Sequence, residues 1–318
     1  MATVSTSGMR DHHDGRGRAS IFGQYSNAEA KAYQQGRSSY PPALYETILS
    51  YHRSTGGEFK VLLDVGCGTG KATRDLAAFF DAANGCDESI DMINVAREVG
   101  GMAASEPIRY HVAAAEKLDS LNAVSPGSVD LITAAMAAQW FDMQLFWQQA
   151  GRLSKPGGTV ALWTLTSGYC HPSTHNAEEV QKILWELEHV TFKPFEPPAL
   201  HIARKLYDSL PLPWTASPSI DVFPESKYVR LEWNRDGQVK PNAHFFSATP
   251  PYMVSLEKFE SALNTASMTK SWRDAHPELA GTDADCIKVA ISRLSVALEG
   301  REEFEHGGGT VLLLFKRV

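Results

Sequence analysis

Short apolar runs alternate with stretches of helical periodicity between residues 42 and 164. Apolar residues recur three to four positions apart over residues 42–53, at Leu44, Ile48 and Leu49, which predicts a helix there. The same criteria predict helices at residues 72–80 and 146–153, and strands at residues 61–65, 108–113, 128–135 and 159–164, with another strand ending near residues 85–89. This alternation predicts an α/β fold with a Rossmann-like, doubly wound and mainly parallel sheet.

The order is looser after residue 165. Residues 166–251 contain many prolines and aromatic residues around one good helical stretch near residues 178–189, and they are too apolar to be a linker. We therefore predict that residues 166–251 form a helical and loop-rich substrate lid. A sixth strand is expected at residues 228–233. Residues 252–318 are expected to complete the core, with a strand at 310–316 and helices at 256–263 and 285–298.

The first part of the chain divides at about residue 20. Residues 1–20 are rich in Gly, Ser, Thr, Arg and His and lack apolar periodicity, so we expect a disordered tail. Aromatic residues recur between residues 21 and 40. We expect this segment to cap the core, so that residues 21–165 form one unit of cap and core.

A glycine-dense turn follows the predicted strand at residues 61–65. Residues 64–70 read Asp-Val-Gly-Cys-Gly-Thr-Gly, and glycine lets main-chain N–H groups approach a bound molecule closely. The dinucleotide fingerprint requires glycine where Lys71 stands, and a phosphate-binding P-loop requires other residues at Val65 and Ala72. The spacing therefore disfavours both a dehydrogenase and a P-loop nucleotide site.

An aspartate follows the second predicted strand at a distance suited to binding a ribose. Asp87 lies about 20 residues past the glycine loop, where an acid can reach a ribose diol across adjacent parallel strands. A carboxylate accepts two hydroxyl hydrogen bonds at such a position. We therefore expect Asp87 to bind the ribose of a nucleoside-containing cofactor.

Composition narrows the class of protein and its partners. The net charge of −7 argues against a nucleic-acid partner, which needs a basic face. We expect neither a membrane span nor a secretory signal, hence a soluble cytoplasmic protein. The four cysteines have neither metal nor disulfide spacing, and His171 and His175 lack the helix and glutamate of a zinc protease site, so no metal is expected.

Several motifs resemble the class I methyltransferases that depend on S-adenosylmethionine (SAM). Residues 64–70 resemble the first motif of that family, residues 85–93 its second motif, and residues 32–41 its Tyr-x-x-x-Arg-Pro-x-Tyr-Pro segment, with Ser38 in place of a proline. Residues 139–142, 158–163, 254–259, 271–272 and 315–318 look like the fungal trans-aconitate and cantharidin methyltransferases. The resemblance implies SAM as cofactor and a seven-stranded sheet whose last strand is antiparallel and lies at the edge.

The resemblance also implies a set of cofactor-binding residues. Relatives carry a polar residue at the position of Ala114 and a histidine at that of Gln139, and an amide cannot take up a proton at neutral pH. The expected cofactor contacts are Tyr33, Arg37, Asp64, Gly66, Gly68, Gly70, Asp87, Ser89, Met92, Ala115, Glu116, Ala134 and Gln139.

The expected reaction is methyl transfer from SAM to a small molecule of secondary metabolism. We expect the acceptor to be an oxygen of a carboxylate or hydroxyl, methylated by direct in-line displacement, with Gln139 and Trp140 positioning the reactants. The alternative is a protein of this fold that binds SAM without transferring methyl, as a cyclase or regulatory partner. Expected substrate contacts are Tyr25, Tyr33, Trp140, His171, His201 and Arg204, with Arg235 as another cation and His171, His201 and His244 as candidate bases.

Overall fold

The computed structural model describes residues 25–37, 39–235 and 253–318. The expected disordered tail and His244 lie outside these residues. The strands are β1 Val61–Val65, β2 Ala82–Asp87, β3 Arg109–Val112, β4 Val129–Ala135, β5 Ser154–Cys170, β6 Val229–Trp233, β7 Met253–Ser255 and β8 Glu303–Lys316. The α-helices are α1 Asn27–Gly36, α2 Pro42–Ser54, α3 Lys71–Ala77, α4 Ile90–Val99, α5 Met143–Leu153, α6 Ala177–Glu186, α7 Pro198–Arg204, α8 Leu256–Asn264, α9 Ser267–Ala275 and α10 Cys286–Ala297.

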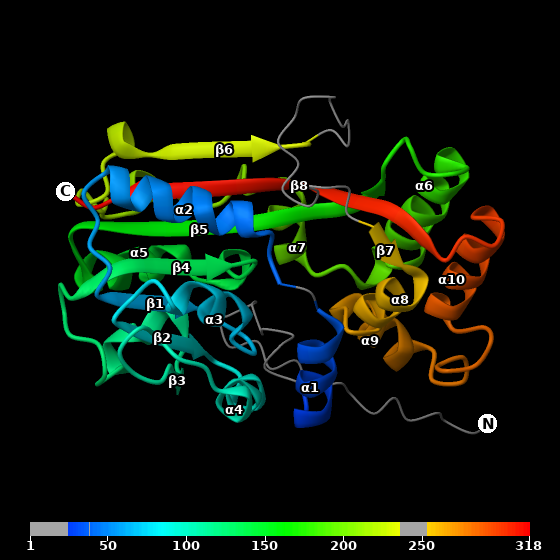
Figure 1. Cartoon of the computed structure of the whole chain (residues 1–318), viewed down its shortest axis with the longest axis horizontal. Helices are drawn as coiled ribbons and strands as arrows, with labels where there is room; N and C mark the ends of the chain where they lie inside the picture. Colours follow the sequence, from blue (N-terminus) through cyan, green and yellow to red (C-terminus); the bar gives the residue numbers. More distant parts are fainter. Residues whose placement is uncertain (1–24, 38, 236–252) are drawn as a thin grey trace, which may run out of the picture.

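One mixed sheet forms the centre of the described structure. Its order is β3-β2-β1-β4-β5-β8-β6, and β7 pairs with one end of β8 (Figure 1). Strands β1 to β5 are parallel to one another, whereas β8 is antiparallel to both β5 and β6. The predicted seven-stranded, mainly parallel sheet with an antiparallel last strand is confirmed along this path. The prediction that the last strand is an edge strand was wrong, because β8 pairs with β5 on one side and with β6 on the other.

Both faces of the sheet are covered, which explains the continuous apolar runs of its strands. Leu63 and Val65 of β1 belong to a core with Phe146 and Trp147 of α5, and Leu62 belongs to a second core on α2 and α3. Burial of each large apolar side chain contributes about 1.5–3 kcal/mol. The predicted strand and helix centres therefore match the structure because each apolar face had a layer to pack against.

Strands β5 and β8 extend beyond the rest of the sheet. They pair from Thr159 with Lys316 to Cys170 with His306 (Figure 1). The sequence predicted a fifth strand over residues 159–164 and a last strand over residues 310–316, but β5 continues to Cys170 and β8 begins at Glu303. Glycines lower strand propensity, and here the long antiparallel partner overrides that preference.

The extension carries a second group of helices, α6, α8, α9 and α10, which we call the second helical group. Its core joins Cys170 of β5 and Phe304 of β8 to Val180, Phe259 and Leu294 of the helices. Helix α1 lies between α4 and α8 in Figure 1, and the buried Ala30 of α1 packs with Met92 and Val95 of α4. This arrangement places one group of helices beyond the carboxyl ends of the parallel strands.

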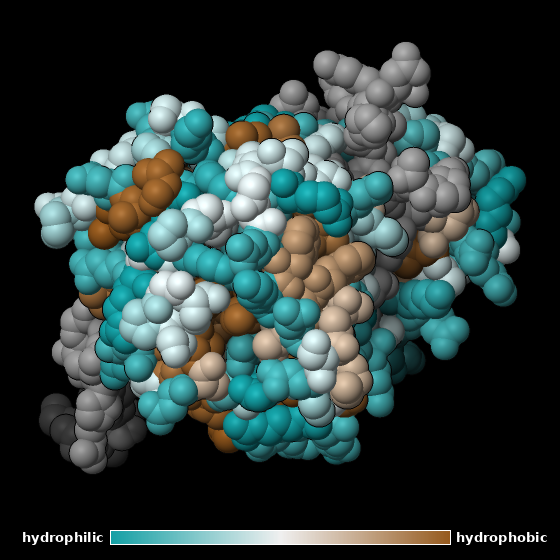
Figure 2. Space-filling model, turned by 60° about the vertical axis from the view of Figure 1, so that its left-hand side comes forward, coloured by the Kyte–Doolittle hydropathy of each residue, from teal (hydrophilic) through white to brown (hydrophobic). Residues whose placement is uncertain are grey.

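On the face shown in Figure 2, hydrophilic residues cover most of the area, and hydrophobic residues form several separate groups. In the part of the chain that the structure describes, every helix is too short or too polar to cross a membrane.

Candidate functional site

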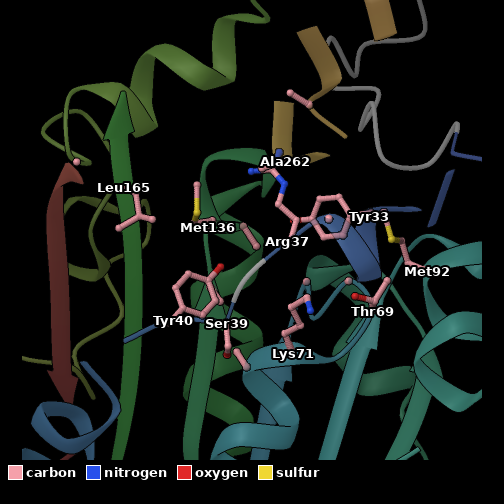
Figure 3. Close-up of a pocket in the computed structure, with 18 of the residues that line it drawn as sticks. Tyr33, Arg37, Ser39, Tyr40, Thr69, Lys71, Met92, Met136, Leu165 and Ala262 are labelled. Carbon is pink, nitrogen blue, oxygen red and sulfur yellow. The ribbon is translucent and has the colours of Figure 1, made fainter. Parts of the chain in front are cut away.

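A cavity of about 630 Å³ lies between the carboxyl ends of the parallel strands and the second helical group. Its volume is in the range of small-molecule sites. Figure 3 shows Tyr33 of α1 and Arg37 just after it, Thr69 of the glycine loop, Lys71 at the start of α3 and Leu165 of β5 around the same space. Ligands of open α/β sheets bind at this edge. We therefore take this cavity as the candidate active site.

The glycine loop forms one wall of the cavity. Gly66 and Gly68 have φ of 66° and 55°, a region that favours glycine. A Cβ on Gly66 would lie 2.6 Å from the Cβ of Ala137, so that glycine is needed for packing. A Cβ on Gly68 would meet no atom of the chain within 4 Å, and Gly68 lines the cavity. The close approach of main chain to a ligand is therefore available at Gly68.

Asp87 ends β2 and lines the cavity beside this loop. Its Oδ2 accepts a hydrogen bond from the N–H of Gly68 at 2.9 Å, and its Oδ1 accepts one from the N–H of Ser89 at 2.9 Å. Burial raises the pKa of the Asp87 carboxyl to about 6, although both amide hydrogen bonds favour the ionised form. Each oxygen keeps acceptor capacity for a ribose hydroxyl.

Five expected cofactor residues lie outside the lining of the cavity. Asp64 is fully buried behind the loop, where its carboxylate accepts hydrogen bonds from the hydroxyls of Thr73 at 2.6 Å and Thr133 at 2.7 Å. Gly70 precedes α3, and a Cβ there would lie 2.7 Å from the Tyr110 ring. The expected residues that do not line the cavity are Asp64, Gly70, Ser89, Ala134 and Gln139.

Gln139 is held by protein partners. Its Oε1 accepts a hydrogen bond from the hydroxyl of Tyr207 at 2.7 Å, and its Nε2 donates to the carbonyl of Met136 at 2.9 Å. Only 3% of Gln139 is exposed, so the expectation that its amide positions the reactants is corrected. The neighbouring Trp140 does line the cavity, and so does Phe141.

The aromatic segment expected to cap the core does reach the cavity. Tyr33, Arg37 and Tyr40 line it. The Arg37 guanidinium lies 5.3 Å from the centre of the Tyr33 ring, and its Nε donates to the hydroxyl of Thr265 at 3.0 Å. Tyr25 is buried away from the cavity and donates its hydroxyl to the carbonyl of Thr265 at 3.2 Å, which corrects its assignment as a substrate contact.

Residues 114–116 form another wall of the cavity, and residue 114 is an alanine where related proteins carry a polar residue. Ala114, Ala115 and Glu116 follow β3 and line the cavity with Met92 of α4. The Glu116 carboxylate accepts a hydrogen bond from the N–H of Asp142 at 2.7 Å. In this stretch, main-chain groups rather than a polar side chain at residue 114 are available to hydrogen-bond the edge of an adenine base.

The cations and histidines proposed for the substrate are engaged elsewhere. Arg204 forms ion pairs with Glu188 at 2.7 Å and Glu196 at 3.1 Å, while Arg235 pairs with Asp208 and Glu232 on the sheet edge. None of His171, His201, Arg204 and Arg235 lines the cavity. His171, His201 and Arg235 have partners outside the cavity, whereas Arg204 pairs with Glu188, which lines the cavity, and with Glu196, which does not.

His306 of β8 lines the cavity and was not predicted from the sequence. Its ring is packed against Phe259, 5.0 Å between ring centres, and against Phe304, 5.8 Å. Burial lowers the pKa of the imidazole to about 4. No motif marks this histidine, and the glycine run at 307–309 beside it was its one sequence signal.

Metal chemistry receives no support from the described side chains. Within residues 25–37, 39–235 and 253–318, no three His, Cys, Asp or Glu side chains are arranged to hold an ion. His171 instead accepts a hydrogen bond at its Nδ1 from the N–H of Ser173 at 3.1 Å.

Comparisons with known proteins agree with this geometry. Residues 63–162 match the methyltransferase domain family. The chain is 35% identical over 138 residues to a probable S-adenosylmethionine-dependent methyltransferase of Saccharomyces cerevisiae, a match over 43% of this chain and 45% of that protein. It is 31% identical over 129 residues to a methyltransferase of Aspergillus aculeatus, over 41% of this chain and 40% of that protein. The chain thus spans less than half the length of these curated relatives.

A solved structure extends the likeness of the fold. A protein of Anaeromyxobacter dehalogenans described as a type II methyltransferase superposes with a TM-score of 0.58 at 24% identity, over 88% of this chain and 97% of that one. The shared fold includes both the sheet and a large share of the segments around it.

Proposed function

We propose that this chain is a class I SAM-dependent methyltransferase that uses SAM as its cofactor. Residues 63–162 match the methyltransferase domain family. The domain match and the relative described as a probable S-adenosylmethionine-dependent methyltransferase support the family and cofactor predicted from the sequence. The proposed function is methyl transfer from SAM to an oxygen of a small molecule, either a carboxylate or a hydroxyl. The observation that carries it is one cavity shared by the glycine loop, Asp87 and the second helical group.

The residues of the cavity fit the cofactor. Asp87 presents carboxylate oxygens for the ribose hydroxyls, and the open space at Gly68 admits the amino-acid end beside the main chain. Lys71 and Arg37 line the same cavity and can pair with the carboxylate of that end. SAM supplies a methyl group that its sulfonium already activates, so the chain has to align the acceptor and exclude water.

The far wall supports a small acceptor. Leu184, Leu187, Phe192 and Phe259 are buried apolar side chains that line the cavity. We propose that the second helical group, within the predicted substrate lid and the segment after it, forms the acceptor wall. Apolar walls exclude water from the reacting oxygen and the methyl group.

Cofactor binding is tested by a matched pair of glycine variants. Gly68→Ala places a methyl group in the cavity, and Gly127→Ala places one at φ of 65° in a turn that also has nothing within 4 Å. Both variants carry similar backbone strain, and Gly127 does not line the cavity. We expect isothermal titration calorimetry to show at least tenfold weaker SAM binding for Gly68→Ala and unchanged binding for Gly127→Ala.

The transfer step is tested on a panel of carboxylic acids, phenols, alcohols, amines and thiols. We expect formation of S-adenosylhomocysteine to depend on an acid or hydroxyl acceptor and to fall with SAM affinity in Gly68→Ala. Equal SAM binding by both glycine variants, or turnover that needs an amine or thiol, contradicts the proposed function.

A further inference from the structure

His306 occupies a place in the cavity that a glycine keeps open. A Cβ added to Gly168 of β5 would lie 2.0 Å from Nε2 of His306, closer than any real Cβ contact. Gly168 and His306 both line the cavity, and the strand pairing sets Gly168 opposite Gly308 and Cys170 opposite His306. The absence of a side chain at residue 168 therefore makes room for the imidazole across the two strands.

The wall around this imidazole is mostly apolar, and we call it the acceptor end. Phe259 and Phe192 supply aromatic faces. Aromatic and branched apolar side chains pack well on a flat apolar ring. The acceptor end comprises Leu184, Leu187, Glu188, Phe192, Phe259, Met268 and His306.

The charges at the acceptor end oppose an anionic acceptor. Glu188 lines the cavity, and its carboxylate forms an ion pair at 2.7 Å with Arg204, one of the cations proposed from the sequence. Arg204 also pairs with Glu196, whose side chain is 1% exposed. Glu188 is the one charged side chain among the seven residues of the acceptor end, so a carboxylate placed against them would lose its hydration without a cation of this group as compensation, which is costly. Lys258 of α8 also lines the cavity but is not among these residues. The seven residues of the acceptor end therefore favour a neutral acceptor.

Resting on the proposed function, we propose that the acceptor is a phenol and that His306 is the catalytic residue that takes its proton. As the phenolic oxygen forms its bond to the methyl carbon, the carbon–sulfur bond breaks and its electron pair stays on sulfur. The phenolic proton passes to a ring nitrogen of His306 and then to solvent. The products are the methyl ether and S-adenosylhomocysteine, and neither an oxidant nor a reductant is needed.

Two physical points support this role. A phenol has a pKa near 10, far below that of an alkyl alcohol, so a neutral imidazole can assist its ionisation. Burial lowers the pKa of His306, which keeps the ring neutral before the reaction but also makes it a weaker base. Negative charge that develops on the adjacent oxygen favours the imidazolium at the moment of transfer.

The first test compares matched acceptors with the wild-type protein. 2-Naphthol and 2-naphthoic acid carry a hydroxyl and a carboxylate on the same ring, and simple phenols and benzoic acids extend the comparison. We expect at least tenfold faster transfer to the hydroxyl member of each pair. Faster transfer to the acids, or to amines and thiols alone, overturns the phenol proposal while leaving methyl transfer established. Absence of transfer to any class contradicts the proposed function itself.

The second test uses His306→Gln, with His175→Gln as the matched control outside the cavity. We expect His306→Gln to keep SAM affinity and to lower kcat with 2-naphthol about 100-fold, since removal of a general base costs this much. With 4-nitrophenol, which is ionised in the assay, the loss should shrink to a few-fold because no proton has to move. Retained activity with 2-naphthol, or an equal loss with both acceptors, overturns the proposal.

A further variant keeps the test valid if His306→Gln is unstable. Gly168→Ala displaces the imidazole without removing it, and its folding and SAM affinity are measured alongside. We expect the same dependence on the acceptor's pKa as for His306→Gln. Full activity of a folded Gly168→Ala with 2-naphthol contradicts the placement of His306.

Discussion

Asp64 and Asp87, near the ends of adjacent strands, both have a raised pKa, but of the two only Asp87 lines the cavity. Burial raises the pKa of Asp64 and of Asp87 to about 6. The carboxylate of Asp64 accepts hydrogen bonds from two threonine hydroxyls, whereas Asp87 lines the cavity. A carboxyl whose pKa is raised by folding stabilises the folded state below its unfolded pKa, near 3.9, and this contribution is lost as the pH rises through 6. Both residues therefore reduce the stability of the unliganded protein at neutral pH.

The affinity for SAM should depend on the ionisation of Asp87. The ionised carboxylate accepts ribose hydroxyls better than the protonated one, so we expect a constant Kd above pH 7 and a rise of up to about tenfold per pH unit below pH 6. Glu88 raises this pKa further, and the amides of Gly68 and Ser89 lower it. Calorimetric titrations between pH 5 and 8 measure the effect.

Asp87→Asn is the control for this pH dependence. The amide does not titrate, so the variant should bind SAM weakly with a nearly constant Kd across the same range. A variant that keeps the wild-type pH profile would assign the titration to another group, such as Asp64.

At the residue scale, the sequence located the cofactor half of the site better than the acceptor half. The glycine spacing and Asp87 are set by local chain geometry around one strand and one loop, which periodicity and motif reveal. The sequence could not predict the positions of the Gln139 and Arg204 side chains relative to the cavity. Gln139 is bonded to Tyr207, which is distant in the sequence, and Arg204 pairs with Glu188 of another helix. His306 needed the pairing of β5 with β8, a contact between residues far apart in the chain.

Among the elements, the long β5 and β8 strands determine where the acceptor wall stands. Apolar periodicity predicted the centres of both strands, but it did not predict their extensions to Cys170 and Glu303. The extensions contain glycines and polar residues, whose own propensity opposes a strand. Tertiary pairing and the core of the second helical group stabilise them instead.

Helix α10 of that group begins at a buried ion pair. Asp285 accepts hydrogen bonds from Nε of Arg273 at 2.7 Å and from the N–H groups of Gly281 and Ile287, both at 2.9 Å. Burial alone would raise the pKa of Asp285, but Arg273 and the two amides lower it to about 2. The ionised carboxylate therefore stabilises the start of α10.

Asp285→Asn should lower the free energy of unfolding by about 2 kcal/mol at pH 7, because a pKa shift of this size corresponds to that energy. Asp283→Asn, on an exposed neighbour, should change it by less than about 0.5 kcal/mol. The loss should stay constant from pH 7 to about 5 and diminish below the unfolded pKa near 3.9 as the pH falls toward 2. Urea unfolding of both variants measures it, and a loss that grows below pH 5 contradicts this account.

For the whole molecule, the fold class followed from the alternation of strands and helices, since a parallel sheet requires crossover helices. The arrangement of the second helical group did not follow, because α9 is short and its apolar face packs on partners from several segments. The cavity exists only where these two parts of the molecule meet. Its cofactor wall belongs to the matched domain, and its acceptor wall lies largely beyond residue 162.

The most direct test of the account follows the methyl group itself. The protein is incubated with SAM that carries a trideuterated methyl group and with the acceptor panel, and the products are analysed by mass spectrometry. We predict an acceptor in which one hydrogen is replaced by CD₃, an equal amount of S-adenosylhomocysteine, and loss of both products in Gly68→Ala. Tight SAM binding without a labelled product from any acceptor would contradict the account.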